Sequence, residues 1–295
     1  MSKAGFVSIL GKPNVGKSTL INRLLGSKLA AVSKKPQTTR QVIRGILTEP
    51  RGQIVFLDTP GMHEPKDQLG RFMMREASKT FYDADLIYWM IEPYPPSAKD
   101  LAVLEMLKKQ IPPAGKPVLG LVNKIDSVSK PEVLPVLDAY QKQFPFTEMI
   151  PISALHGDQV DILLERTFSY LPEHEPYFPS DLATDQTERF IASELIREKI
   201  FRYTGEEIPY STVVQIDQFK DEERIIRISA VIFTEKESQK AILIGSGGQK
   251  MKQIGQAARK DLEIFLGKKV FLELWVKTLK NWKKDERSLR KLGFQ

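Results

Sequence analysis

Residues 11–19 read Gly11-Lys12-Pro13-Asn14-Val15-Gly16-Lys17-Ser18-Thr19, directly after an apolar run at 6–10 and at the start of a helical pattern over 17–25. Two glycines separated by four residues and followed by Lys and Ser predict a loop whose backbone N–H groups surround phosphates, when a strand precedes it and a helix follows. Lys17 is expected to reach the β- and γ-phosphates of a nucleotide, and Ser18 to place its hydroxyl on Mg²⁺. The stretch therefore predicts an α/β domain that opens with a strand, a phosphate-binding loop and a helix.

Apolar runs of strand length alternate with helical patterns up to residue 170, which is typical of an α/β domain. The expected strands lie at 6–10, 54–57, 85–91, 117–122 and 149–152. A sixth run at 43–47 is separated from 54–57 by a segment that contains the turn residues Glu49-Pro50-Arg51-Gly52. This hairpin makes one strand antiparallel, so we expect a mostly parallel, six-stranded sheet with one antiparallel strand.

A Pro-rich stretch divides the chain. Residues 171–180 contain three prolines and no apolar periodicity, and beyond them the order of patterns changes to α-β-β-α-α-β, followed by a basic tail helix at 277–291. A chain of 295 residues exceeds the size at which one hydrophobic core usually stops growing. We therefore expect a first domain at 1–171, a linker at 172–187 and a second, α+β domain at 188–295.

A second element on the phosphate side is expected where the strand at 54–57 ends. Asp58-Thr59-Pro60-Gly61-Met62 follows that strand. Asp58 is expected to hold Mg²⁺ through its first water shell, and the Gly61 N–H to contact the γ-phosphate. Asp-Thr-Pro-Gly by itself is an ordinary turn. Its place after a strand that follows a phosphate loop makes all five residues candidates for nucleotide contact.

A base-binding site is expected at the ends of the next two strands, where Asn123-Lys124-Ile125-Asp126 and Ser153-Ala154-Leu155 stand. Guanine presents an N1–H and an exocyclic amine that one carboxylate accepts together, which is the role expected of Asp126. Adenine has neither donor, so a buried Asp126 would reject ATP. Asn123 is expected to bond N7, the Lys124 stem to cover the ring, and the Ala154 N–H to meet O6.

Residues 6–170 resemble the GTPase domain of the translation-factor class, because all of its guanine-nucleotide elements occur in order. The resemblance implies a P-loop GTPase that binds GTP or GDP with Mg²⁺ and has a slow intrinsic rate. It implies that 37–40 is the first switch and that Thr39 joins Ser18 and Asp58 as a metal ligand when GTP is bound. Spacing alone does not separate Thr38 from Thr39. The catalytic residues implied in this way are Lys17, Ser18, Thr39 and Gly61.

The position that orients the attacking water in many GTPases is occupied here by Met62, which neither donates nor accepts usefully. The sequence therefore resembles GTPases with a hydrophobic residue there, which position water by other means. His63 is adjacent, although an exposed histidine in such a loop more often has no role. Asn14 matches the asparagine that binds K⁺ in some relatives. The alternative is that Asn14 only stabilises its own turn.

A second glycine-rich loop, Gly245-Ser246-Gly247-Gly248, lies between two helical stretches. G-x-x-G within an α-β-β-α-α-β order predicts a type II KH domain, whose loop clamps the backbone of about four nucleotides beside an apolar groove. Such loops usually carry a basic residue between the glycines, whereas this one has Ser246 and Gly247, so backbone N–H groups must make most of the phosphate contacts. Trp275 is expected in the core, because KH domains read bases in a groove. The expected RNA-binding residues are Ile244, Gly245, Ser246, Gly247, Gly248, Lys250, Lys252 and Arg259.

A GTPase domain joined to a C-terminal KH domain by a short Pro-rich linker resembles the Era family. The resemblance covers essentially the whole chain and rests further on Tyr210-Ser211, on Glu273-Leu274-Trp275-Val276-Lys277 and on Asp285-Glu286-Arg287-Ser288-Leu289-Arg290. It implies binding to the 3′ end of 16S ribosomal RNA and a role in maturation and assembly of the small ribosomal subunit. We expect a monomer that works in the cytoplasm.

Composition and charge exclude several other classes. The chain has no cysteine and three widely spaced histidines, which excludes disulfide scaffolds, zinc ribbons and iron–sulfur clusters. No apolar run approaches the ~18 residues that cross a bilayer. Of the net charge of +7, residues 1–50 hold 9 Lys and Arg against 1 acidic residue, and residues 251–295 hold 12 against 5. Two basic zones suggest two anionic ligands.

Two alternatives stay open. One is an RNA-binding scaffold whose nucleotide mainly stabilises the fold. The other is a membrane-surface GTPase, since a Lys-rich tail can also meet anionic lipid at the inner face of the cell membrane.

Overall fold

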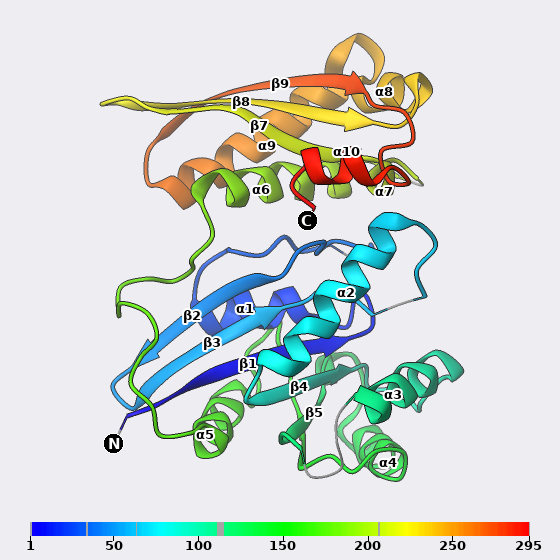
Figure 1. Ribbon diagram of the computed structural model, residues 1–295, viewed down its shortest axis with the longest axis vertical. Helices are drawn as coiled ribbons and strands as arrows, with labels where there is room; N and C mark the ends of the chain where they lie inside the picture. The colour runs from blue at the N-terminus through cyan, green and yellow to red at the C-terminus, as the bar shows by residue number, and fades with distance from the viewer. Residues whose placement is uncertain (1, 34, 63, 111–114, 206, 295) are drawn as a thin grey trace. The chain divides into compact units, whose positions relative to one another are not determined.

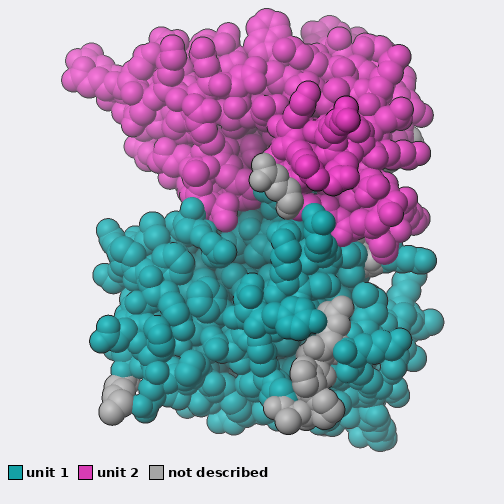
Figure 2. Space-filling model, viewed as in Figure 1, with its two compact units in different colours: residues 1–29, 39–64, 73–185 teal, residues 30–38, 65–72, 186–295 magenta. Residues whose placement is uncertain are grey.

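The computed structural model describes residues 2–33, 35–62, 64–110, 115–205 and 207–294 (Figure 1). The chain forms two compact units (Figure 2). The N-terminal unit consists of residues 1–29, 39–64 and 73–185. The C-terminal unit consists of residues 30–38, 65–72 and 186–295. Two short segments from the first half of the sequence are therefore part of the C-terminal unit.

A six-stranded sheet forms the centre of the N-terminal unit, in the order β2-β3-β1-β4-β5-β6 (Figure 1). β2 pairs antiparallel with β3, and the other neighbouring strands are parallel. The predicted sheet, with its one antiparallel strand in a hairpin, is confirmed. The strands are β1 Lys3–Gly11, β2 Ile43–Glu49, β3 Gly52–Asp58, β4 Leu86–Ile91, β5 Val118–Val122 and β6 Glu148–Pro151.

Helices connect these strands and bury the sheet. They are α1 Lys17–Leu25, α2 Gln68–Asp83, α3 Ala98–Gln110, α4 Lys130–Gln141 and α5 Val160–Tyr170. Every residue of β3, β4 and β5 is buried, as expected of strands whose two faces are both covered by helices. The strand order reverses at β1, which lies between β3 and β4. The loops after β1 and β3 therefore lie at the carboxyl ends of these strands, where α/β folds of this kind bind their ligands.

The C-terminal unit contains a three-stranded sheet in the order β7-β8-β9, with β7 antiparallel and β9 parallel to β8. Helices α6 and α9 lie on one face of it (Figure 1), and buried residues such as Leu195, Ile254 and Leu262 pack with the strands in one core. The order α-β-β-α-α-β confirms the predicted KH fold. The elements are α6 Glu188–Tyr203, α7 Ile208–Ser211, β7 Val213–Asp221, β8 Ile225–Thr234, α8 Glu237–Ile244, α9 Gln249–Leu266, β9 Lys269–Thr278 and α10 Glu286–Lys291.

Trp275 does not pack in the core, contrary to the prediction. Its side chain is 59% exposed. Along β9, Leu272, Leu274 and Val276 pack against the helical core. Because successive side chains of a strand point to opposite faces, Trp275 lies on the face away from the helices, together with Phe271. The expectation failed because alternation defines two faces of β9, and only the packing of the helical core decides which of them is covered.

The predicted tail helix at 277–291 is also shorter than expected. β9 continues through Thr278, which stays in register with Thr234 of β8. Helix α10 begins only after Asp285, whose carboxylate accepts a hydrogen bond from the Ser288 N–H at 2.8 Å. Within the described part of the chain, no helix is both long and apolar enough to cross a bilayer.

Candidate functional site

The loop between β1 and α1 has a backbone that requires glycine at two positions. Gly11 has φ 146° and Gly16 has φ 106°, both in the region that side chains rarely adopt. A Cβ on Gly16 would lie 2.2 Å from Nδ2 of Asn123, and a Cβ on Gly11 would lie 2.4 Å from the Met90 carbonyl oxygen. The loop can therefore close around a small anionic group only with glycine at both positions. Asn14, at φ 68°, is exposed on this loop.

Lys17 is held inside this loop. Its side chain is buried, and Nζ donates to the carbonyl oxygens of Gly11 at 3.2 Å and Lys12 at 3.0 Å. Burial lowers the pKa of Lys17 to about 8, partly offset by the negative charge of Asp58. Phosphate oxygens in the loop would favour the charged ammonium, because an anion nearby raises the pKa of a buried cation.

Three oxygen-bearing side chains converge beside the loop. Ser18 Oγ donates to Asp58 Oδ2 at 2.8 Å, Thr39 Oγ1 donates to the same oxygen at 3.2 Å, and the two hydroxyl oxygens are 3.0 Å apart. This all-oxygen set fits Mg²⁺, which is usually held by one or two protein groups together with waters and substrate phosphates. Thr38 points elsewhere, since its hydroxyl donates to the Lys35 carbonyl at 2.7 Å. The residues that the structure describes contain no cluster of three or more His, Asp or Glu suited to holding a metal by itself.

The turn after β3 lies against the phosphate loop. Thr59 Oγ1 donates to the Ile9 carbonyl at 2.6 Å, and a Cβ on Gly61 would come within 2.8 Å of Pro13. The Met62 N–H donates to the Gly11 carbonyl at 3.1 Å, while its side chain is 1% exposed and belongs to the hydrophobic core. Met62 therefore offers no side-chain polar atom to a water at the site. The expectation for His63 lies outside the described residues.

Asn123, at the end of β5, joins the phosphate loop to the loop after β6. Its Nδ2 donates to the Val15 carbonyl at 2.6 Å, and its Oδ1 accepts from the Ala154 N–H at 2.9 Å. The buried Asn123 side chain thus fixes the spacing of two loops that belong to separate strands. Asn123, Val15 and Ala154 are far apart in the sequence, but they meet because neighbouring parallel strands have their carboxyl ends on the same side of the sheet.

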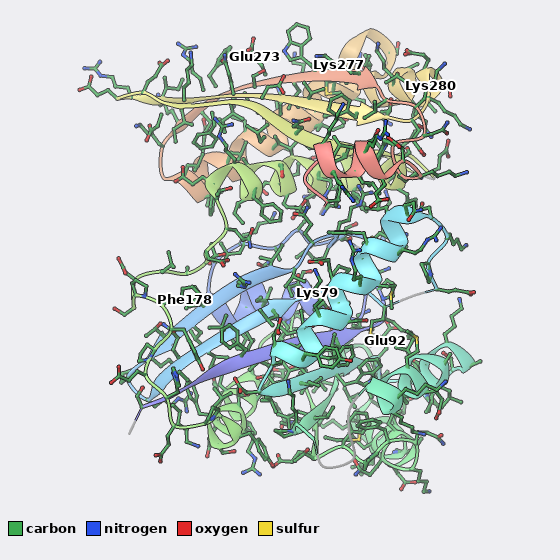
Figure 3. All side chains as sticks on the ribbon, viewed as in Figure 1. Lys79, Glu92, Phe178, Glu273, Lys277 and Lys280 are labelled. Carbon is green, nitrogen blue, oxygen red and sulfur yellow. The ribbon has the colours of Figure 1, made fainter. Side chains whose placement is uncertain are left out.

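Asp126 is positioned by the same pair of loops. Its Oδ1 accepts from Ser153 Oγ at 2.5 Å, and its Oδ2 lies 3.9 Å from His156 Nε2. The preceding Lys124 has φ 66°, and its Nζ forms an ion pair at 2.6 Å with Glu92, just beyond the end of β4 (Figure 3). The Arg23 guanidinium donates to the carbonyl of Leu155. A carboxylate, an amide and a long aliphatic stem are therefore close together beyond the ends of β5 and β6.

In the C-terminal unit, the second glycine-rich loop lies between α8 and α9. Gly245, Gly247 and Gly248 have φ values of 75°, 55° and 76°, so the chain turns tightly before α9 begins. A Cβ on Gly245 would lie 2.8 Å from the Lys250 Cβ. The Gln249 N–H, which begins α9, donates to the Ser246 carbonyl, and this end of the helix carries the positive end of the helix dipole, which favours a phosphate.

The other predicted RNA-contact residues lie near this loop to different degrees. Ile244 ends α8 and is partly exposed. Lys250 and Lys252 are in the first turn of α9, and Lys252 is exposed. Arg259 is exposed too, but it lies about two helical turns further along.

A group of buried charges on α6 was missed by the sequence reasoning. The Arg197 side chain is 3% exposed, and its Nε donates to Glu194 Oε1 at 2.8 Å. The same guanidinium donates to the carbonyl of Gln37, at 3.4 Å, and to the carbonyl of Thr38. The two residues immediately before Thr39, which belong to the expected first switch, are therefore bound through their backbone carbonyls to a helix of the KH fold.

Two further contacts hold the same segment. The Val32 N–H donates to Glu198 Oε2 at 3.0 Å. Lys35 Nζ donates to the Phe201 carbonyl at 2.5 Å and to the Thr204 carbonyl, where α6 ends. The signal in the sequence was a run of Glu, Arg and Lys among buried apolar residues of a helix, since such charges are seldom buried unless paired.

Known protein families match both the N-terminal and the C-terminal part of the chain. The family described as "50S ribosome-binding GTPase" matches residues 6–124, and the family described as "KH domain" matches residues 207–283. GTPase Era of Syntrophus aciditrophicus is 48% identical over 100% of this chain and 96% of that protein. GTPase Era of Staphylococcus haemolyticus is 46% identical over 99% of this chain and 97% of that protein.

Two solved structures also match over nearly the whole chain. Era in complex with MgGDPNP and nucleotides 1506–1542 of 16S ribosomal RNA has a TM-score of 0.95 at 42% identity, covering 100% of this chain and 99% of that chain. A single-residue variant of Aquifex aeolicus Era bound to GDP and AlF4⁻ has a TM-score of 0.94 at 42% identity, covering 99% of each chain. With both domains matched and full-length relatives near half identity, the chain belongs to the Era family of GTPases.

Proposed function

We propose that this protein is a Mg²⁺-dependent GTPase that binds the 3′ end of 16S ribosomal RNA and acts in maturation and assembly of the small ribosomal subunit. One observation carries the proposal. Asn123 and Asp126, the residues expected to bind guanine, are held beside the phosphate loop and the loop after β6, and the same chain has a G-x-x-G loop in a KH fold. The Era structure that matches the whole chain was solved with MgGDPNP and a 3′-terminal segment of that RNA.

Each element of the nucleotide site has a role in this proposal. Lys17 contacts the β- and γ-phosphates, and the backbone N–H groups of the phosphate loop and Gly61 stabilise charge on the transferred group. Ser18, Thr39 and Asp58 hold Mg²⁺ directly or through water, and the ion supplies charge neutralisation at the phosphates. Asp126, Asn123 and Lys124 select the base. The remaining nucleotide contacts are those of residues 11–16, Thr19, Thr59, Pro60, Met62 and 153–155.

Thr39 and Thr38 provide a matched pair of variants. Thr39→Ala removes a hydroxyl that lies 3.2 Å from the Asp58 carboxylate, so we expect GTP hydrolysis to fall by about 10- to 100-fold, as for other partners of a metal site. Thr38→Ala removes a hydroxyl that donates to the Lys35 carbonyl, away from Asp58, and should leave turnover nearly unchanged. Single-turnover rates at saturating Mg²⁺ measure both. The reverse ranking would assign the metal-ligand role to Thr38.

We also propose that K⁺ assists hydrolysis beside Asn14. The residue is exposed on the phosphate loop, and the buried Met62 brings no polar side chain to the site. The competing explanation is that Asn14 only supports its left-handed turn, a conformation that asparagine tolerates well. Asn14→Gly keeps that backbone conformation and removes the side chain. Faster turnover in KCl than in NaCl, lost in Asn14→Gly, would support a bound K⁺, whereas equal rates in both salts would contradict it.

The nucleotide state is proposed to control RNA binding, with GTP favouring it over GDP. Support comes from hydrogen bonds that join Val32, Lys35 and Gln37 to helix α6. Thr39, the next residue, lies at the proposed Mg²⁺ site. If GTP and RNA both favour the same conformation of the switch, binding of one raises the affinity for the other, and the coupling free energy is the same in both directions.

RNA binding is tested at the G-x-x-G loop. Ser246→Asp places a carboxylate beside the expected phosphate path, and charge repulsion should weaken binding to an RNA like the 1506–1542 segment by about tenfold or more. Ser246→Ala is the matched control and should bind normally. Binding is measured by fluorescence anisotropy of the full-length protein, with an unrelated RNA of equal length and anionic vesicles as competitors.

The same measurement separates the alternatives. Displacement of the RNA by vesicles alone would favour a membrane-surface GTPase. Normal RNA binding that is independent of nucleotide would favour a scaffold whose nucleotide only stabilises the fold. The favoured function places a monomer in the cytoplasm, with a GTPase domain at 1–171, a linker at 172–187 and a KH domain at 188–295.

A further inference from the structure

The KH sheet has an open face that carries large aromatic side chains. Alternation along β9 puts Lys269, Phe271, Glu273, Trp275 and Lys277 on the face away from the helical core, here called the outer sheet face. Figure 3 shows Glu273 and Lys277 on the side of the sheet away from α6.

Two aromatic rings on this face are accessible to solvent. Trp275 is 59% exposed and Phe271 is 44% exposed, whereas Trp89 and Trp282 are 1% and 0% exposed. Trp275 lies opposite Val231 of β8, and Phe271 lies opposite Arg227. Leaving two aromatic rings in water forgoes the free energy that burial would give, so a ligand that covers them would gain it.

Cations surround the two rings. The Arg227 guanidinium carbon lies 5.2 Å from the centre of the Phe271 ring. Lys220 of β7 is opposite Arg227, and Lys269 and Lys277 are exposed at the two ends of the row on β9. The acidic residues on or beside this face are Glu273, between the rings, Glu222, which is paired with Arg227, and Asp217, which is exposed at the bulge in β7. The cationic groups on the outer sheet face outnumber the acidic ones. A surface that combines this positive charge with exposed aromatic rings complements a polyanion that carries flat bases.

We propose that the outer sheet face is a second contact surface for single-stranded RNA, on which unpaired bases stack on Trp275 and Phe271 while Arg227 and Lys277 contact the phosphates. This combination of aromatic stacking and cationic backbone contacts is what proteins use for single-stranded nucleic acid. The surface differs from the G-x-x-G loop, which lies between α8 and α9. The inference rests on the proposed RNA-binding function and adds a second contact area to it.

Tryptophan fluorescence tests the contact directly. Because Trp89 and Trp282 are buried, quenching by acrylamide reports mainly on Trp275, and Trp275→Phe supplies the background. A long RNA like the 1506–1542 segment should protect Trp275 from acrylamide. An RNA of about four nucleotides, long enough only for the G-x-x-G loop, should protect it much less.

Affinity provides the second readout. Trp275→Ala should weaken binding of the long RNA about tenfold, within the range for loss of one stacked base. Ile264→Ala, on α9 and 73% exposed, is the matched control and should have no effect. Trp275 and Ile264 are both exposed, so neither change should unfold the protein.

The outcomes distinguish this inference from the function on which it rests. If wild-type protein binds the long RNA but Trp275 stays open to acrylamide and Trp275→Ala binds normally, the outer sheet face is not an RNA surface, and the proposed function stands. If Trp275 is shielded by small-subunit ribosomal proteins and not by RNA, the face binds protein and the inference is overturned. If the wild-type protein binds no RNA at all, the proposed function fails together with it.

Discussion

Asp126→Asn is expected to weaken GTP binding by about 10²- to 10⁴-fold, since two charge-assisted hydrogen bonds to guanine would be lost or weakened. The fold should persist, because an asparagine oxygen can still accept from Ser153 Oγ, which bonds Asp126 at 2.5 Å. Calorimetric titration with GDP and a non-hydrolysable GTP analogue measures the loss. Affinity that stays within a few-fold of wild type would remove Asp126 from the base site.

Xanthine nucleotides make the test specific. Xanthine carries a carbonyl where guanine has its amine, so the asparagine amide can donate to that oxygen and accept from N1–H. Asp126→Asn should therefore bind xanthosine triphosphate better than GTP, reversing the wild-type order. Asp138→Asn is the charge-matched control, since this exposed carboxylate on α4 pairs with Lys142, one helical turn away. It should leave both affinities unchanged.

The double variant Glu194→Gln/Arg197→Met is expected to remove the dependence of RNA affinity on nucleotide. It deletes the guanidinium that donates to the Gln37 and Thr38 carbonyls, while the methionine keeps much of the buried volume. Changing Arg197 alone would leave Glu194 buried without its cation, at a cost of about 3–5 kcal/mol. Coupling between two sites typically changes affinity by about 5- to 150-fold. In the double variant, the ratio of RNA affinities between the GTP-bound and GDP-bound forms should fall towards one.

Anisotropy titrations of the RNA with the GDP-bound and GDPNP-bound forms measure that ratio. The control is Glu286→Gln/Arg290→Met, which removes an exposed ion pair on α10 and should preserve the ratio. If the α6 variant is stable by thermal unfolding and still discriminates between nucleotides as wild type does, the contact of α6 with residues 32–38 does not transmit the nucleotide state.

The phosphate loop and the base motif could be predicted from the sequence because their geometry is local. Gly11 and Gly16 are required by backbone conformations within one short loop, and Asn123 and Asp126 follow one buried strand. The period of the apolar runs was enough to give the six-stranded sheet, since strands and helices bury their faces with different periods. The α-β-β-α-α-β order of the KH domain could be predicted from the sequence for the same reason.

Choices between neighbouring residues could not be made in this way. Thr38 and Thr39 are adjacent, yet only the folded chain brings the Thr39 hydroxyl within 3.2 Å of Asp58, which is distant in sequence. The contact of Arg197 with the Gln37 carbonyl bridges 160 positions of the chain. Such pairings depend on how elements pack, and no local propensity encodes them.

The sequence by itself was enough to predict which groups would bind phosphate, guanine and an RNA backbone, because each of these motifs carries its own loop geometry and donors. Only the tertiary structure decided three other points. These are whether the Thr38 or the Thr39 hydroxyl contacts Asp58, which helix binds the backbone of Gln37 and Thr38, and which face of β9 remains open. The physical reason is that a strand alternates its side chains without indicating which face will be covered. The packing of α6 and α9 on one side of the KH sheet leaves Trp275 on the other.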